Sequence, residues 1–325
     1  MYVCPSCRET LALAEGKLVC RGCGSSYPVR NGIPRFVDSE SYAHSFGFQW
    51  RKFAKTQIAG PQKAISQARF DATTGWPKDL RGQVILEAGC GAGRFSEIAL
   101  DTGAEVYSFD LSEAVEANRQ NTSRHERLGH FHLFQADIYR IPLPHGMFDK
   151  IFCLGVLQHC PDVRKAFLSL VPFLKPGGEL VVDCYLSQPL KHAFGLKYWL
   201  RPFVAGWPPP RLFHFCESAV SISYDLKSAL SKMPGAGAFL SALVPIGRLH
   251  YEPEYHFSAD QMKEVKSLSL FDMLSPRHDK CQRISNFRVW AGEAGLEMIH
   301  LGKGYNGINA IARRSRADEA PVGIS

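Results

Sequence analysis

The stretch ILEAGCGAGRF, residues 85–95, joins an apolar run to three alternating glycines and decides the fold. Residues 83–88 (QVILEA) predict a buried parallel strand, and the residues from the last glycine to Gly103 predict an amphipathic helix. Such a strand, turn and helix let a ligand approach the backbone at the helix N-terminus, where unpaired N–H groups point outward. The stretch therefore predicts an α/β fold with a ligand at this turn.

The spacing of the glycines argues against a dinucleotide. A G-x-G-x-x-G/A fingerprint would need Gly or Ala where this chain has Arg94, and Glu87 stands just before Gly89, Gly91 and Gly93. An acid close to a pyrophosphate would repel it, whereas the same acid beside a cationic amino group is favourable. S-adenosylmethionine, which has such an amino group and no phosphate, is the ligand that these residues favour.

Two further acids end predicted strands. The second strand, AEVYSFDLS, ends at Asp110, whose carboxylate can accept both ribose hydroxyls. The third, FHLFQADI, ends at Asp137, which can accept the adenine amino group. Three acids at three strand ends predict one ligand site.

The N-terminus carries two C-x2-C knuckles, Cys4 with Cys7 and Cys20 with Cys23, separated by twelve residues. Two such turns can aim four sulfurs at one tetrahedral ion, and thiolates favour zinc. Four cysteines close the coordination shell, so we expect a structural zinc and not a catalytic one. The short module cannot be held by burial alone, and we expect the rest of the chain to stay folded when the metal is removed.

These motifs, with FDKIFCLGVLQH (148–159) and LKPGGELVV (174–182), resemble those of class I S-adenosylmethionine-dependent methyltransferases. The resemblance covers residues 83–184 and 284–314. It implies a Rossmann-like, doubly wound, mostly parallel seven-stranded sheet. It also implies cofactor contacts from the following residues: Glu87, Gly89, Gly91, Gly93, Asp110, Leu111, Asp137, Ile138 and Gly155.

The segments YPVRNGIPRFV (27–37) and SFGFQWRKF (45–53) are similar to those of a bacterial subgroup that fuses a zinc ribbon ahead of this core. The likeness implies that Phe46, Gln49 and Trp50 lie on a helix that covers the cofactor. Phe46 and Trp50 are four residues apart, so they fit the core of an ordinary amphipathic helix equally well.

Two residues are candidates for the chemistry. His159 follows the predicted fourth strand and is either a general base or a residue that orients a loop and shapes the pocket. A helix over RISNFRVWAGEAG (283–295), capped by Ser285, precedes a predicted hairpin whose tip holds Tyr305. Tyr305 either borders the acceptor, as the resemblance implies, or only stacks on the turn.

The chain divides into consecutive segments. We expect a zinc ribbon (1–38), N-terminal helices with the lid (39–82), the core (83–184), a helical substrate cap (185–283), the last helix and hairpin (284–314) and a disordered tail (315–325). The aromatic and apolar runs of the cap either face a hydrophobic or lipid-linked substrate or pack between cap and core.

Composition limits the class of protein. The chain has 325 residues, 45% hydrophobic, with a formal net charge of +7 that is spread along its length, which does not favour a nucleic-acid partner. It has no apolar run of membrane-spanning length and no signal pattern, so we expect a cytoplasmic enzyme; peripheral membrane contact and the oligomeric state stay open.

The expected function is methyl transfer from S-adenosylmethionine to oxygen, nitrogen or carbon of a small molecule, a saccharide or a lipid-linked glycan. One alternative is an RNA base methyltransferase that grips RNA with the ribbon, although residues 1–38 hold only a modest excess of basic side chains. The other is a non-catalytic module that retains the cofactor pocket.

Overall fold

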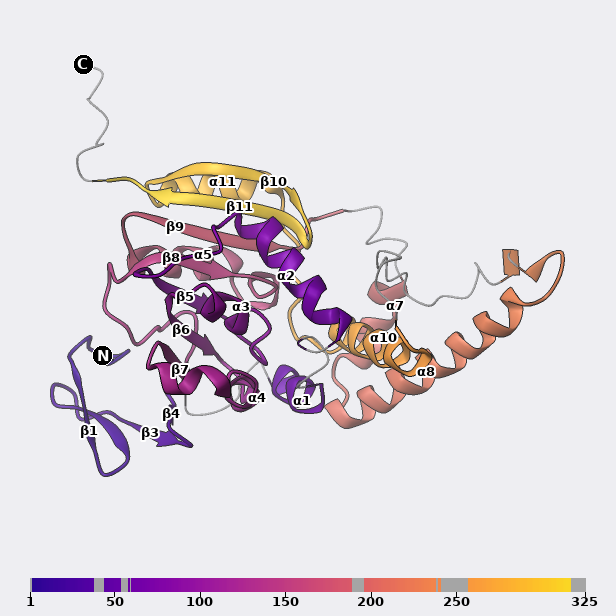
Figure 1. Cartoon of the computed structure of the whole chain (residues 1–325), viewed down its shortest axis with the longest axis horizontal. Helices are drawn as coiled ribbons and strands as arrows, with labels where there is room; N and C mark the ends of the chain where they lie inside the picture. Colours follow the sequence, from indigo (N-terminus) through magenta and orange to yellow (C-terminus); the bar gives the residue numbers. More distant parts are fainter. Residues whose placement is uncertain are drawn as a thin grey trace, which may run out of the picture.

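The computed structural model describes residues 2–37, 44–53, 58, 60–188, 196–237, 239–240 and 257–316. Its centre is a seven-stranded sheet of order β10-β11-β9-β8-β5-β6-β7 (Figure 1). The strands from β5 to β9 pair in parallel, and β11 is antiparallel to both β9 and β10. The bounds are β5 Val84–Ala88, β6 Glu105–Asp110, β7 Phe131–Gln135, β8 Phe148–Cys153, β9 Leu174–Cys184, β10 Leu296–Gly304 and β11 Gly307–Arg314.

Both faces of this sheet are buried, which explains the nearly continuous apolar run in β5. Ile85 packs with one apolar cluster and the neighbouring Leu86 with another, because successive side chains of a strand point to opposite faces. Side chains from α2 (Pro61–Thr74) and α3 (Ser96–Asp101) cover one face. Side chains from α5 (Val163–Leu170) and α11 (Ile284–Glu293) cover the other. The predicted doubly wound α/β fold is confirmed.

The last helix does not begin as expected. Helix α11 starts at Ile284 with Arg283 in the cap position and no side-chain cap, so Ser285 lies inside the first turn. The reason is tertiary: Gln282 is paired with Leu186 and its N–H donates to the Tyr185 carbonyl, which holds the chain extended up to Arg283. The hairpin β10–β11 forms where it was predicted, with Tyr305 and Asn306 at its turn.

The N-terminal module is a four-stranded antiparallel sheet against the outer edge of β7 (Figure 1). The Phe36 N–H donates to the Gln135 carbonyl, and the Tyr2 ring lies 5.3 Å from the Phe36 ring and 5.5 Å from that of Phe134. Module and core thus share an apolar cluster. The strands are β1 Leu11–Ala14, β2 Lys17–Cys20, β3 Ser26–Arg30 and β4 Ile33–Pro34.

The described part of the predicted cap is mainly helical, with α7 (Leu196–Val204), α8 (Pro209–Ser231) and α10 (Ala259–Leu274), whereas residues 275–283 are not helical, so the predicted helix over FDMLSPRHDK (271–280) ends at Leu274. Helix α1 (His44–Lys52) packs against α4 (Ala114–Asn121), α8 and α10. In Figure 1 the long α8 extends away from the sheet. Most of the predicted helical stretch AGAFLSALVPIGRL (236–249), and residues 317–325 of the predicted tail, lie outside the described residues.

Within the described residues, the structure contains no helix that is both long and apolar enough to cross a bilayer.

Candidate functional site

A cavity of about 290 Å³ lies at the carboxyl ends of β5, β6 and β8, the edge where the strand order reverses. Its walls come from helix α1, the glycine turn, the residues that follow β6 and β8, and the cap helix α10. Of the fourteen predicted cofactor-binding and catalytic residues, the walls include Phe46, Gln49, Trp50, Gly89, Gly91, Asp110, Leu111, Ile138, Gly155, His159 and Tyr305. The remaining three, Glu87, Gly93 and Asp137, are not among the described lining residues.

Two glycines of the turn lie so close to neighbouring side chains that a Cβ would not fit at either position. Gly89 has φ +80, and a Cβ there would lie 2.3 Å from a methyl group of Val156. Gly91 has φ +50, and a Cβ there would lie 3.1 Å from the Trp50 indole nitrogen. Both positions therefore need glycine, and the Trp50 ring lies over the turn as a lid would.

Asp110 is the predicted acid that reaches the cavity. One of its oxygens accepts the Gly91 N–H at 2.9 Å, and the other accepts the Ser112 N–H at 2.8 Å and the Ser112 hydroxyl at 2.7 Å. These bonds hold the carboxylate at the wall, and burial raises its pKa. A carboxylate fixed in this way fits a ribose diol.

Glu87 lies behind the turn. Its carboxylate accepts hydrogen bonds from the hydroxyls of Ser96 and Ser108, and the Asn118 amide donates to Ser96 at 2.8 Å. Burial raises the pKa of Glu87 to about 7. The acid ties β5 to the start of α3, and Gly93 lies against the same Asn118.

Asp137 is also outside the wall, where it accepts the Tyr139 N–H at 3.0 Å; its neighbours Ala136 and Ile138 line the cavity. The structure thus does not bring the three acids to one wall: Asp110 lines it, and Glu87 and Asp137 support it. Direct contacts of Glu87 and Asp137 with the ligand stay predictions.

Helix α1 presents two different faces. Phe46, Gln49 and Trp50 line the cavity, whereas the Phe48 ring packs 5.9 Å from that of Phe271 in the cap. Gln49 donates to Asp272 at 3.2 Å, and its amide oxygen is buried with no partner among the described residues. A buried carbonyl oxygen at a cavity wall indicates a place for a ligand donor. Gln158, also at the wall, has a second such oxygen.

His159 lies in a 3₁₀ turn over Leu157–His159, directly after β8 and near its carboxyl end. Its ring is 5.1 Å from that of Phe46 and 5.7 Å from that of Tyr185. Its Nδ1 lies 3.0 Å from the His278 carbonyl oxygen, which can only accept. The neutral ring therefore carries its proton on Nδ1 and its lone pair on Nε2, as a general base requires.

One buried network at the cavity was not predicted. Arg69 of α2 and Asp183 of β9 form an ion pair at 2.6 Å, with 10% and 2% of their side chains exposed. Asp183 also accepts the Gly155 N–H and the Asn306 side-chain amide, and the Arg69 guanidinium lies 5.1 Å from the centre of the Tyr305 ring. No motif marks Arg69 or Asp183, because the two residues are 114 positions apart along the chain.

Further polar contacts fasten the cap to the residues that follow β8. Arg201 of α7 pairs with Asp279 at 2.7 Å, and the next residue, Lys280, donates its N–H to the Gln158 carbonyl. These contacts fix the segment that supplies the His278 carbonyl to His159. Helix α10 contributes Val265, Leu268, Ser269 and Asp272 to the wall.

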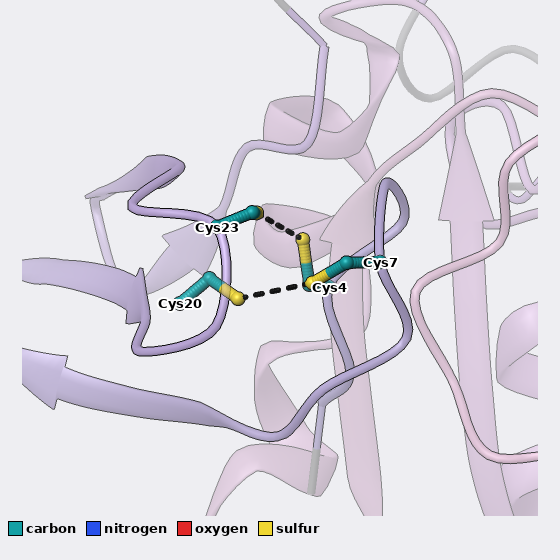
Figure 2. A group of neighbouring side chains, drawn as sticks. All are labelled: Cys4, Cys7, Cys20 and Cys23. Carbon is teal, nitrogen blue, oxygen red and sulfur yellow. Dashed lines mark hydrogen bonds between the residues drawn. The ribbon is translucent and has the colours of Figure 1, made fainter.

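The N-terminal cysteines form a second site, which is a candidate metal centre (Figure 2). The sulfurs of Cys4, Cys7, Cys20 and Cys23 lie within 4.8 Å of one another, with Cys7 and Cys20 at 3.3 Å and Cys4 and Cys23 at 3.6 Å. A tetrahedral zinc with Zn–S bonds of about 2.3 Å separates its sulfurs by about 3.8 Å. Four thiolates at this spacing fit a structural zinc with no open position.

Two family models match the chain. Residues 86–182 match the model described as "Methyltransferase domain", and residues 2–32 match the model described as "Trm112p-like protein". The two matches agree with the core and the ribbon described above.

Among curated proteins, the chain is similar to a malonyl-[acyl-carrier protein] O-methyltransferase of Enterobacter lignolyticus, 38% identical over 108 residues that cover 33% of this chain and 40% of that protein. A ubiquinone biosynthesis O-methyltransferase of Coxiella burnetii is 33% identical over 101 residues, 31% of this chain and 43% of the relative. The chain thus spans about two fifths of the length of these relatives.

Among solved structures, the chain is similar to a magnesium protoporphyrin IX methyltransferase from Synechocystis PCC 6803 with bound SAH. The identity is 16% and the TM-score 0.45, over 85% of this chain and 97% of that one.

Proposed function

We propose that this chain, which carries a methyltransferase domain behind an N-terminal Trm112p-like zinc ribbon, transfers the methyl group of S-adenosylmethionine to an oxygen of a small-molecule acceptor. The observation that carries the proposal is the cavity, whose walls combine Asp110 and the glycine turn with His159 and cap helix α10. The relatives named above are both O-methyltransferases, which favours oxygen over nitrogen and carbon. The proposed acceptors include saccharides and lipid-linked glycans.

Different segments of the chain bind different parts of the cofactor in this proposal. In the proposal, Asp110 accepts the ribose hydroxyls, the wall at Leu111 and Ile138 holds the adenine, and the glycine turn admits the methionine end. Helix α1 closes over the turn with Trp50. We propose the same boundaries for the ribbon, the lid, the core and the cap as the sequence predicts.

The transfer itself needs alignment and a dry site. The bound cofactor supplies an electrophilic methyl group on a sulfonium whose positive charge disappears as the methyl leaves, so apolar walls favour the transition state. Phe46 and Leu268 contribute such walls. His159 accepts the proton of a hydroxyl acceptor on Nε2, and the His278 carbonyl keeps the ring in the required tautomer. A purely positioning role of His159 is the alternative.

The contacts of the ribbon's basic side chains do not favour the RNA alternative. Arg8 donates to the carbonyls of Ile141 and Leu143, and Arg35 is paired with Glu116. Two of the ribbon's basic side chains therefore hold it to the core. Lys17, Arg21 and Arg30 stay exposed, which is a small cationic surface for a polyanion.

Calorimetric titration of the zinc-loaded protein with S-adenosylmethionine, S-adenosylhomocysteine and NAD tests the proposal. We expect the first two to bind and NAD not to bind. Asp110→Ala should weaken binding by about a hundredfold, because two hydrogen bonds to a charged group are lost. Asp79→Ala, at an exposed loop acid paired with Arg81, is the matched control and should leave binding unchanged. Binding of NAD alone, or tight cofactor binding by Asp110→Ala, would contradict the proposal.

A further inference from the structure

Exposed apolar side chains gather on the cap. Of the twelve large hydrophobic side chains exposed in the described chain, eight lie between residues 199 and 240. Scattered exposed apolar residues are ordinary on a monomer, whereas a local concentration marks a contact surface. The eight are Trp199, Phe203, Phe215, Ile222, Leu226, Met233, Phe239 and Leu240.

These side chains form stripes along two helices. On α7, Trp199 and Phe203 are one turn apart, with 66% and 77% of their surfaces exposed. On α8, Phe215, Ile222 and Leu226 are spaced by seven and four residues, which places them on one side of the helix. We call these five residues the cap ridge.

An adjoining face of α8 is buried against the rest of the cap. Leu212, Phe213 and Cys216 are buried in one cluster with Leu268 and Phe271 of α10. Helix α8 therefore has two apolar sides, one of which faces the protein and one of which faces outward. The interior of the fold needs only the first, so packing does not account for the second.

The charge next to the cap ridge is basic. Residues 196–237 contain five Lys or Arg, one of which, Arg201, is paired with Asp279, against the two acids Glu217 and Asp225. Lys263 of α10 pairs with Asp225 at 2.7 Å, which leaves Arg211, Lys227 and Lys232 opposed by Glu217 alone within this segment. Large aromatic and aliphatic side chains flanked by cations are the pattern of helices that lie in a bilayer interface.

We propose that the cap ridge docks on the surface of an anionic lipid bilayer. A second copy of the chain would bring like charges together on this surface. A lipid surface accommodates both helices and is complementary to their charge. Because no described helix can span the bilayer, the contact is peripheral.

Two packed helices, α8 and α10, connect the docking surface with the cavity. The same helix α10 that packs against α8 lines the cavity with Val265, Leu268 and Asp272. A membrane-borne acceptor with an apolar tail would therefore meet the site from the cap side. The entry of a membrane-borne acceptor rests on the proposed function, whereas the contact with the lipid surface does not.

Vesicle flotation with the full-length zinc-loaded protein tests the docking. We expect binding to phosphatidylcholine vesicles that contain about a third phosphatidylglycerol, little binding to phosphatidylcholine alone, and loss of binding in high salt. The double variant Phe203→Ser with Leu226→Ser should reduce binding at least tenfold. The matched control is Leu13→Ser with Val289→Ser, which removes two equally exposed apolar side chains outside the cap.

Titration with S-adenosylhomocysteine is run on every variant. Unchanged affinity for S-adenosylhomocysteine shows that the ridge variant is folded. If neither the variants nor the unmodified chain bind S-adenosylhomocysteine, the result counts against the proposed function and not against docking. Absence of vesicle binding, or equal binding by ridge and control variants, would overturn the docking proposal. A dimer in light scattering that the ridge variant abolishes, without vesicle binding, would also overturn it and assign the ridge to a second copy.

Discussion

At the scale of single residues, Asp110 and Glu87, two acids that the sequence assigns to one ligand site, lie in different surroundings. Asp110 is held at the cavity wall by Gly91 and Ser112, whereas Glu87 is 2% exposed and bound by two serine hydroxyls. The direction in which each strand turns its last residues decides which acid lines the cavity. The acid that precedes the glycines is thus part of the scaffold of the turn.

Glu87 should make stability depend on pH. Its pKa is raised from 4.5 to about 7 in the folded state, so between these values the folded chain keeps a proton that the unfolded chain has lost. The free energy of unfolding therefore falls as pH rises through this window, by roughly 3 kcal/mol, and is level above it. Glu87→Gln removes this dependence. Urea denaturation at pH 5 and pH 7.5 measures the difference between the two proteins.

All histidines are common to both proteins, so their titration cancels in this comparison. Equal pH dependence of wild type and Glu87→Gln would show that the acid is ionised in the folded state across this range.

At the scale of elements, the ribbon and the sheet are joined by polar contacts as well as by aromatic rings. Gln135, at the end of β7, accepts from Arg35 of the ribbon at 3.2 Å and donates to the Leu111 carbonyl at 2.8 Å. Leu111 lines the cavity, so a short chain of hydrogen bonds connects the metal-binding module with the ligand wall. The ribbon contributes to the shape of the site as well as to its own fold.

Removal of zinc should therefore destabilise the whole molecule. We expect a chelator to release one zinc per chain and to lower the melting temperature of the main calorimetric transition by several degrees or more, because module and core share one apolar cluster. Metal release followed with a chromogenic chelator and scanning calorimetry give the two measurements. A main transition that is unchanged after zinc loss would instead support the independent ribbon that the sequence alone suggests.

At the scale of the whole molecule, an ion pair and a hydrogen bond that share Asp183 connect three distant segments. Arg69 precedes the first core strand, Asp183 ends the fifth, and Asn306 lies in the turn of the last hairpin. Arg69 and Asn306 line the cavity, and Asp183 holds the Gly155 backbone.

Asp183→Asn should destabilise the fold by about 3 kcal/mol, because it leaves the buried Arg69 charge without its partner. Adding Arg69→Met should recover part of this loss, since no buried charge then remains. Urea denaturation of the two single variants and the double variant forms a cycle. Additive losses would mean that the two side chains do not interact in solution.

Much of the architecture could be predicted from local patterns. Short motifs predict the features that depend on residues near one another in the chain. These features are the strands of the core, the glycine turn, the closing hairpin and the four-cysteine module. The lid is an intermediate case. Phe46 and Trp50 fit either lid or core by spacing, and Phe48 is the residue that packs into the cap.

The sequence by itself determined the fold class, the turn that opens toward a ligand, the acid at the end of the second strand and the cysteine ligands. Tertiary structure decided that Glu87 stands behind the turn, that Arg69 meets Asp183, that the ribbon joins the core and that His159 receives its tautomer from the loop after α10. The physical reason is the range of the interactions. Periodicity and motif spacing report contacts within a few turns or one strand, whereas burial and side-chain pairing depend on segments that meet only when the chain has folded.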